Sequence, residues 1–183
     1  GVLVEGEPLH FAAVNVILAD EEVELDKATY AEYLGTTLDH TWNDLRARFS
    51  LAHGYEHYAD LYDAVVMEQY RTRAEAMPGA RALLERLEQA EVPRAVASSS
   101  NRNWVETALT KLGMRASFQA VVAGDEVRQG KPDPEIYLSA AAKLGAKPKV
   151  CTVIEDAPAG IESGRRAGMQ VVAVRTEMTA GIE

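Results

Sequence analysis

Residues 150–174 read VCTVIEDAPAGIESGRRAGMQVVAV. The apolar run over 150–154 predicts a short buried strand, and the periodicity over 159–167 predicts a helix that the following glycine would end. A second apolar run over 171–174 predicts another strand. Two successive strands that are joined through a helix lie parallel in one sheet and are connected by a right-handed crossover. This segment therefore predicts a βαβ unit, and parallel sheets bind ligands at the carboxyl ends of their strands.

The same alternation extends upstream from this unit. Further strands are predicted over 92–97 and 120–123, and helices are predicted after Pro78, over 104–112 and over 133–144. Four short apolar strands that alternate with amphipathic helices are typical of an α/β fold built on a parallel sheet.

Residues 1–76 follow a different pattern. Apolar residues recur there at helical spacing over 11–19, 38–52 and 55–74, and no stretch gives a convincing strand pattern. The sequence therefore predicts an all-helical unit that is followed by a unit of alternating strands and helices.

Length and composition narrow the class of protein. The 183 residues suffice for one compact domain, or for a core domain with a smaller insertion. No apolar run approaches the roughly 18–20 residues that span a bilayer, which argues against an integral membrane protein. The net charge of −9 disfavours binding to nucleic acid or to an anionic membrane surface. Cys151 is the one cysteine, so we expect a reducing cytoplasm. We also expect a monomer or weak homo-oligomer.

Polar side chains follow the predicted strands in an order that suggests one site. They are Ser98, Ser99, Ser100 and Asn101 after the first strand, Lys131 after the second, and Glu155 with Asp156 after the third. Hydroxyls and a lysine can hold phosphoryl oxygens, and one or two carboxylates suit a magnesium ion that keeps several waters. Each group alone has a simpler explanation, such as a helix cap or a solvated loop charge. Together they predict phosphoryl transfer that is assisted by magnesium.

Four phrases carry a resemblance to a known family. Residues 96–101, 130–137 and 153–161 resemble the second, third and fourth motifs of the haloacid dehalogenase superfamily of phosphohydrolases, and residues 1–10 resemble the segment after its first motif. The resemblance is to the branch that contains beta-phosphoglucomutase and sugar-phosphate phosphatases. It implies an α/β fold, in which a Rossmann-like parallel sheet core carries an inserted α-helical cap domain.

The resemblance also implies boundaries and roles. Residues 1–6 would begin the core, 7–76 would form the cap, and 77–183 would form the rest of the core. Ser98 and Lys131 would act on the phosphoryl group, while Asp156 would bind Mg²⁺ directly and Glu155 directly or through water. The expected substrate-binding residues are His10, Ser99, Ser100 and Asn101.

Two departures from the family pattern bear on the reaction. The family's first motif is an Asp-x-Asp pair whose first aspartate is the nucleophile, and Gly1 matches the residue after that pair. We therefore expect the sequence to be a truncated copy that is inactive for lack of this aspartate. Leu38 stands where mutase members carry an arginine that binds a second phosphate, which favours hydrolysis.

We therefore expect a magnesium-dependent phosphatase that acts on a small phosphorylated metabolite, such as a sugar phosphate, through an aspartyl-phosphate. A phosphosugar mutase of the beta-phosphoglucomutase kind is the first alternative. A non-catalytic fragment or binding remnant is the second.

Overall fold

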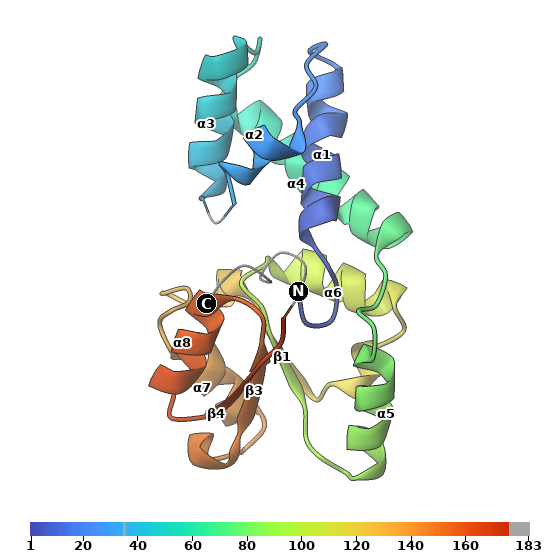
Figure 1. The fold of residues 1–183 in the computed structure, drawn as a ribbon, viewed down its shortest axis with the longest axis vertical. Coiled ribbons are helices and arrows are strands. Elements are labelled where there is room, and N and C mark those ends of the chain that lie inside the picture. The colour runs from blue at the N-terminus through green and yellow to red at the C-terminus, as the bar shows by residue number, and fades with distance from the viewer. Residues whose placement is uncertain (35, 176–183) are drawn as a thin grey trace. The chain divides into compact units, whose positions relative to one another are not determined.

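The computed structural model of the protein describes residues 1–34 and 36–175; residue 35 and residues 176–183 lie outside the described part (Figure 1). The chain divides into two compact units. One comprises Gly1–Glu5 and the chain from Glu75 onward, and we call it the sheet unit. The other, Gly6–Ala74, we call the helical unit. Among the described residues, no helix has both the length and the apolar character that crossing a membrane requires.

The sheet unit alternates helices and strands as the sequence predicts. Its helices and strands are α5 (Ala80–Gln89), β1 (Ala95–Ala97), α6 (Arg102–Lys111), β2 (Ala120–Val122), α7 (Glu135–Lys143), β3 (Thr152–Glu155), α8 (Pro158–Arg166) and β4 (Gln170–Ala173). Short 3-10 turns lie at Arg115–Ser117 (η1), Gly124–Glu126 (η2) and Pro148–Val150 (η3). After α6, α7 and α8 the chain turns at Gly113, Gly145 and Gly168, whose φ angles of 65°, 65° and 71° are the left-handed values that favour glycine.

The strands pair in parallel, which confirms the α/β class. Val96 of β1 is in register with Val121 of β2, and Val153 of β3 is in register with Val171 of β4. The expectation of one continuous sheet needs a correction, because the described strands form two separate pairs. Within the described ranges β1 bonds only to β2, and β3 only to β4.

Helices α7 and α8 hold the carboxyl end of β3 in place. Ile136 of α7 packs in one apolar cluster with Val122 of β2 and Val153 of β3. Helix α8 approaches the β3–β4 pair so closely that a Cβ on Gly164 would lie 2.9 Å from a methyl group of Val171. Burial of these apolar groups fixes the position from which Glu155 and Asp156 project.

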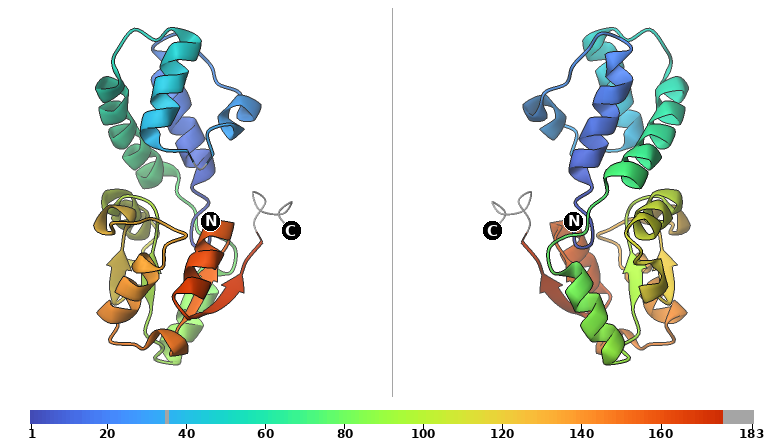
Figure 2. Two further views of the ribbon diagram at one scale, coloured as in Figure 1. Left: turned by 90° about the vertical axis from the view of Figure 1, so that its left-hand side faces the viewer. Right: turned by 90° about the vertical axis from the view of Figure 1, so that its right-hand side faces the viewer.

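The helical unit is built around one long helix. Its elements are α1 (Glu7–Ala19), α2 (Lys27–Ala31), α3 (Leu38–Phe49) and α4 (Tyr55–Arg73). Helices α1 and α3 both pack on α4, and α1 lies beside α4 in both views of Figure 2. The fully buried Trp42 stacks on Tyr58 at a ring-centroid distance of 5.2 Å. The apolar periodicity predicted three of these helices, and α2 was missed.

The two segments that lead to and from the helical unit are joined within the sheet unit. Val4 and Ala76 form an antiparallel bridge, and the backbone N–H of Met77 donates to the Leu3 carbonyl at 2.9 Å. The chain thus leaves the sheet unit and returns to it at adjacent positions.

Candidate active site

A loop of four polar residues, Ser98–Asn101, follows β1. The Ser98 backbone N–H donates to the Val122 carbonyl at 3.0 Å, so the β1–β2 ladder continues into this loop. The Ser98 hydroxyl oxygen accepts a hydrogen bond from the Ser100 backbone N–H at 3.2 Å. Asn101 is the cap residue that precedes α6. These backbone bonds hold the Ser98 hydroxyl at the carboxyl end of the strand.

Lys131 joins the ends of two strands that do not pair with each other. Its ammonium donates to the Ala97 carbonyl at the end of β1, at 3.2 Å, and to the Glu155 carboxylate at the end of β3. The lysine side chain is 11% exposed and that of Glu155 is 8% exposed, so the ion pair is largely removed from water. A buried pair of this kind is retained only when additional hydrogen bonds satisfy both charges.

Protein groups bond both carboxylate oxygens of Glu155. The Tyr137 hydroxyl donates to Oε1 at 2.6 Å, and the backbone N–H groups of Asp156 and Ala157 donate to Oε2 at 3.0 and 3.2 Å. A Cβ on Gly160 would lie 2.1 Å from the Glu155 carboxyl carbon, so only glycine leaves room for this carboxylate against α8.

The electrostatics of Glu155 follow from these contacts. Burial alone would raise the pKa of this carboxyl, but the Lys131 charge and the hydrogen bonds from Lys131 and Tyr137 keep the pKa below its usual value. The same burial, with the hydrogen bond to Glu155, raises the pKa of the Tyr137 hydroxyl, which therefore stays a donor. The Tyr137 ring centroid also lies 4.9 Å from the Lys131 nitrogen, within reach of a cation–π contact.

Asp156 is the more accessible acid of the pair. Its side chain is 15% exposed, and its Oδ2 atom lies 3.2 Å from the backbone nitrogen of Gly1. In the part of the chain that the structure describes, no group of three or more histidine, cysteine or acidic side chains could hold a metal ion. The hard carboxylate oxygens still fit magnesium, because this ion commonly binds through one or two carboxylates together with phosphate oxygens and water.

His10 lies in the helical unit, whereas the other seven predicted site residues belong to the sheet unit. Its Nδ1 atom is 2.8 Å from the Tyr62 hydroxyl oxygen, and its Nε2 atom is 3.1 Å from that of Tyr70. Burial lowers the pKa of His10 to about 4, so the imidazole is neutral at physiological pH.

Comparison with known proteins identifies the family. Residues 1–174 match the profile described as haloacid dehalogenase-like hydrolase. The chain belongs to this family.

Its relatives include phosphatases of small phosphorylated molecules. The validoxylamine A 7'-phosphate phosphatase of Streptomyces hygroscopicus subsp. limoneus is 34% identical over 150 residues, which are 82% of this chain and 64% of that protein. The hexitol phosphatase A of Escherichia coli K12 is 42% identical over 99 residues, 54% of this chain and 45% of that protein. The chain thus spans less than two thirds of either relative.

A solved structure shows the same fold. The protein from Thermotoga maritima, described as a candidate beta-phosphoglucomutase, superposes with a TM-score of 0.88 at 25% identity. The match covers 99% of this chain and 84% of that one.

In this haloacid dehalogenase-like hydrolase, sequence reasoning left two residues of the site without a role. Tyr137 lies in the 130–137 phrase but was assigned only to a helix, and Gly160 was likewise assigned only to a helix. The tyrosine six positions after Lys131 was the available indication for the first. The close approach of Gly160 to Glu155 depends on how α8 packs, which no local pattern gives.

Proposed function

We propose that this protein is a magnesium-dependent phosphomonoesterase that cleaves a small phosphorylated metabolite, such as a sugar phosphate, through an aspartyl-phosphate. The observation that carries the proposal is the Lys131 ammonium, which bonds both the Ala97 carbonyl, directly before Ser98 in sequence, and the Glu155 carboxylate, directly before Asp156. A cation, a hydroxyl and an acidic pair at the carboxyl ends of parallel strands suit the stabilisation of a transferring phosphoryl group.

We assign a role to each predicted site residue. Lys131 and Ser98 donate to phosphoryl oxygens, where the negative charge of the transition state is concentrated. We assign contact with the rest of the substrate to Ser99, Ser100, Asn101 and, in the helical unit, His10. The helical unit would be the inserted cap, an assignment supported by the Val4–Ala76 bridge between its two connections.

Magnesium would be held by the acidic pair. Asp156 offers an accessible carboxylate, whereas both oxygens of Glu155 already accept protein hydrogen bonds. We therefore assign Asp156 as the direct ligand and Glu155 as a ligand either through water or after giving up one of its present donors. When bound, the ion would neutralise charge on phosphoryl oxygens.

We propose that the nucleophile is the first aspartate of the family's Asp-x-Asp motif. The family's Asp-x-Asp pair matches positions before Gly1, whose nitrogen lies 3.2 Å from Asp156. We also place the protein in the cytoplasm, since it has one cysteine.

The test compares two polypeptides on a generic aryl phosphate with Mg²⁺. A chain extended upstream of Gly1 by the Asp-x-Asp motif should release phosphate, and the 183-residue polypeptide should not. In the extended chain Asp156→Asn should abolish magnesium-dependent release. Turnover by the 183 residues alone would refute the assignment of the nucleophile, and unchanged turnover in Asp156→Asn would refute the metal assignment.

The named relatives bear on the choice between hydrolysis and isomerisation. A phosphosugar mutase is the second candidate, because the structural neighbour from Thermotoga maritima is described as one. Leu38 has no guanidinium to bind a second phosphate, so we favour hydrolysis. Incubation with a sugar phosphate separates the two, since hydrolysis gives free phosphate and a mutase gives an isomeric phosphosugar. A non-catalytic fragment would give neither product even in the extended chain.

A further inference from the structure

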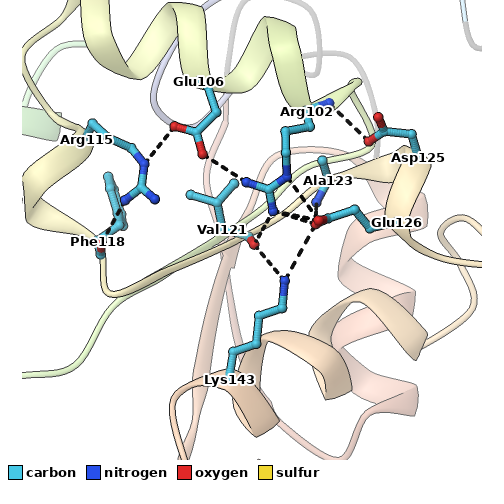
Figure 3. A network of polar contacts seen from close by, with 9 residues as sticks. All are labelled: Arg102, Glu106, Arg115, Phe118, Val121, Ala123, Asp125, Glu126 and Lys143. Carbon is cyan, nitrogen blue, oxygen red and sulfur yellow. Dashed lines mark hydrogen bonds and ion pairs between the residues drawn. The ribbon is translucent and has the colours of Figure 1, made fainter.

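A network of charged side chains lies next to the 98–101 loop and connects α6, β2 and α7 (Figure 3). We propose that its two central members, Arg102 and Glu126, are positioning residues that set the shape of the 98–101 loop and thereby its affinity for phosphate. The part of this inference that concerns phosphate rests on the proposed function.

Arg102 directly follows the 98–101 loop and bonds to the neighbouring strand β2 and to the 124–126 turn. Its backbone N–H donates to the Asp125 carboxylate at 3.0 Å. Its guanidinium donates to Glu126 through Nε at 3.0 Å and through Nη2 at 2.7 Å, and Nη2 also donates to the Val121 carbonyl at 2.9 Å. The remaining arm, Nη1, donates to Glu106 at 2.9 Å, one turn further along α6. A planar guanidinium can donate to Glu126, Val121 and Glu106 at once, whereas a single ammonium cannot.

The 124–126 turn, which Arg102 contacts, is hydrogen-bonded directly to the 98–101 loop. The Gly124 backbone N–H donates to the Ser100 carbonyl at 2.9 Å. A Cβ on Gly124 would lie 2.1 Å from the Ser99 carbonyl oxygen, so the backbones of turn and loop are in direct contact. Any displacement of this turn is therefore transmitted to Ser99 and Ser100.

Glu126 fixes the shape of the turn as well as its link to α6. Its carboxylate accepts a hydrogen bond from the Ala123 backbone N–H at 3.0 Å, which closes the turn on itself. Lys143 of α7 approaches the same carboxylate at 3.7 Å and donates to the Val121 carbonyl at 3.1 Å. Hydrogen bonds from Arg102 and from Ala123 lower the pKa of Glu126 to about 2, so the carboxylate is ionised at neutral pH.

Neither Arg102 nor Glu126 is among the residues that we propose to contact the phosphoryl group. Arg102 and Glu126 contact each other, the 124–126 turn, β2, Glu106 of α6 and Lys143 of α7, and both side chains are 32% exposed. Their effect on phosphate would therefore act through the geometry of the loop, which makes them positioning residues and not catalytic ones.

The test uses Arg102→Lys, which keeps the charge but loses the planar fork, and Glu126→Gln, which keeps the shape but loses the charge. The matched control is Arg166→Lys, because Arg166 pairs only with Glu162 one turn away on the exposed face of α8 in the contacts described. Two quantities are measured at a temperature where every variant is folded. They are amide hydrogen exchange at Gly124 and Ser98, followed by NMR, and the dissociation constant for inorganic phosphate in the presence of Mg²⁺.

Both test variants should exchange the Gly124 amide about tenfold faster and bind phosphate about tenfold more weakly than the wild type, which is the change that loss of roughly one charge-assisted hydrogen bond produces. Amides in β3 and β4 should be unaffected, and Arg166→Lys should behave as the wild type.

If exchange at Gly124 and Ser98 matches that of the control, the positioning role is refuted. If exchange accelerates but phosphate affinity does not change, the loop does not set that affinity and the inference fails in its second part. A wild-type protein that does not bind phosphate at all refutes the proposed function, while the exchange data still decide the role of Arg102 and Glu126 in shaping the loop.

Discussion

The Lys131–Glu155 pair of the sheet unit and the His10–Tyr62–Tyr70 cluster of the helical unit are both polar groups that the fold largely removes from water. In the sheet unit an ammonium and a carboxylate are buried together, so each stabilises the charge of the other. In the helical unit the imidazole lies between two phenolic hydroxyls, and burial leaves it neutral. The Lys131–Glu155 pair therefore keeps its charges despite burial, whereas burial keeps the His10 imidazole neutral. This difference supports our assignment of the proposed phosphoryl transfer to residues of the sheet unit.

The largest expected effect is the removal of one charge from the buried pair. Lys131→Met leaves the Glu155 carboxylate buried without its ammonium, and breaking a buried ion pair in this way costs about 3–5 kcal/mol. Urea denaturation should show the loss in the free energy of unfolding. The exposed Lys149→Met should change it by less than about 0.5 kcal/mol. A loss below about 1 kcal/mol in Lys131→Met would mean that the hydrogen bonds to Glu155 suffice and that the contrast between the two units is wrong.

The neutral histidine gives the second prediction, which concerns pH. The pKa of His10 is about 4 in the folded protein and 6.5 in the unfolded chain, so between these values only the unfolded chain binds the proton. Stability is therefore complete above pH 6.5 and declines as the pH falls towards 4, by about 2–3 kcal/mol from this residue.

His10→Gln isolates this contribution, because glutamine does not titrate. The difference in unfolding free energy between the wild type and His10→Gln should shrink as the pH falls from 7 to 4, measured by urea denaturation at each pH. His40→Gln, at an exposed position of the same unit, is the matched control variant. A constant difference between wild type and His10→Gln would show that His10 titrates normally.

The third prediction concerns the close packing of the Glu155 carboxylate against Gly160 of α8. Gly160→Ala would place a Cβ 2.1 Å from the Glu155 carboxyl carbon. Overpacking of this kind should lower the free energy of unfolding by about 1–3 kcal/mol. Gly130→Ala is the matched control, because nothing lies within 4 Å of the Cβ built there. Equal stability of the two variants in thermal denaturation would show that the Glu155 side chain adopts another position at little cost.

Local patterns predicted much of the secondary structure, and packing decided the remainder. Helix ends at Gly113, Gly145 and Gly168 were predictable because the left-handed turn after a helix is a property of one residue. Helix α2 has five residues and begins at the Asp26 side chain, which accepts from the Thr29 backbone N–H at 2.7 Å. Apolar periodicity does not reveal so short a helix.

Some residues of the candidate site were likewise predictable from local patterns, and others depend on packing. The rule that parallel strands gather ligands at their carboxyl ends was enough to select Lys131, Glu155 and Asp156. The role of Tyr137 was not predicted, because its hydroxyl reaches Glu155 only when α7 packs beside β3. The two residues are 18 positions apart in sequence. The pairing of the strands into two sheets is likewise non-local, so alternation along the chain could not show it.

The smallest expected effect compares one tyrosine from each unit. The Tyr137 hydroxyl donates to a carboxylate at 2.6 Å, and the Tyr70 hydroxyl lies 3.1 Å from a neutral imidazole nitrogen. Hydrogen bonds to charged groups contribute about 1.5–3 kcal/mol and those between neutral groups about 0.5–1.5 kcal/mol. Tyr137→Phe should therefore lower the free energy of unfolding by about 1 kcal/mol more than Tyr70→Phe does, in urea denaturation at pH 7. Phenylalanine keeps the ring in both cases, so the comparison isolates the hydroxyl groups. If Tyr70→Phe proved the more destabilising, the helical unit would depend on its hydrogen bonds as strongly as the sheet unit does on its charges.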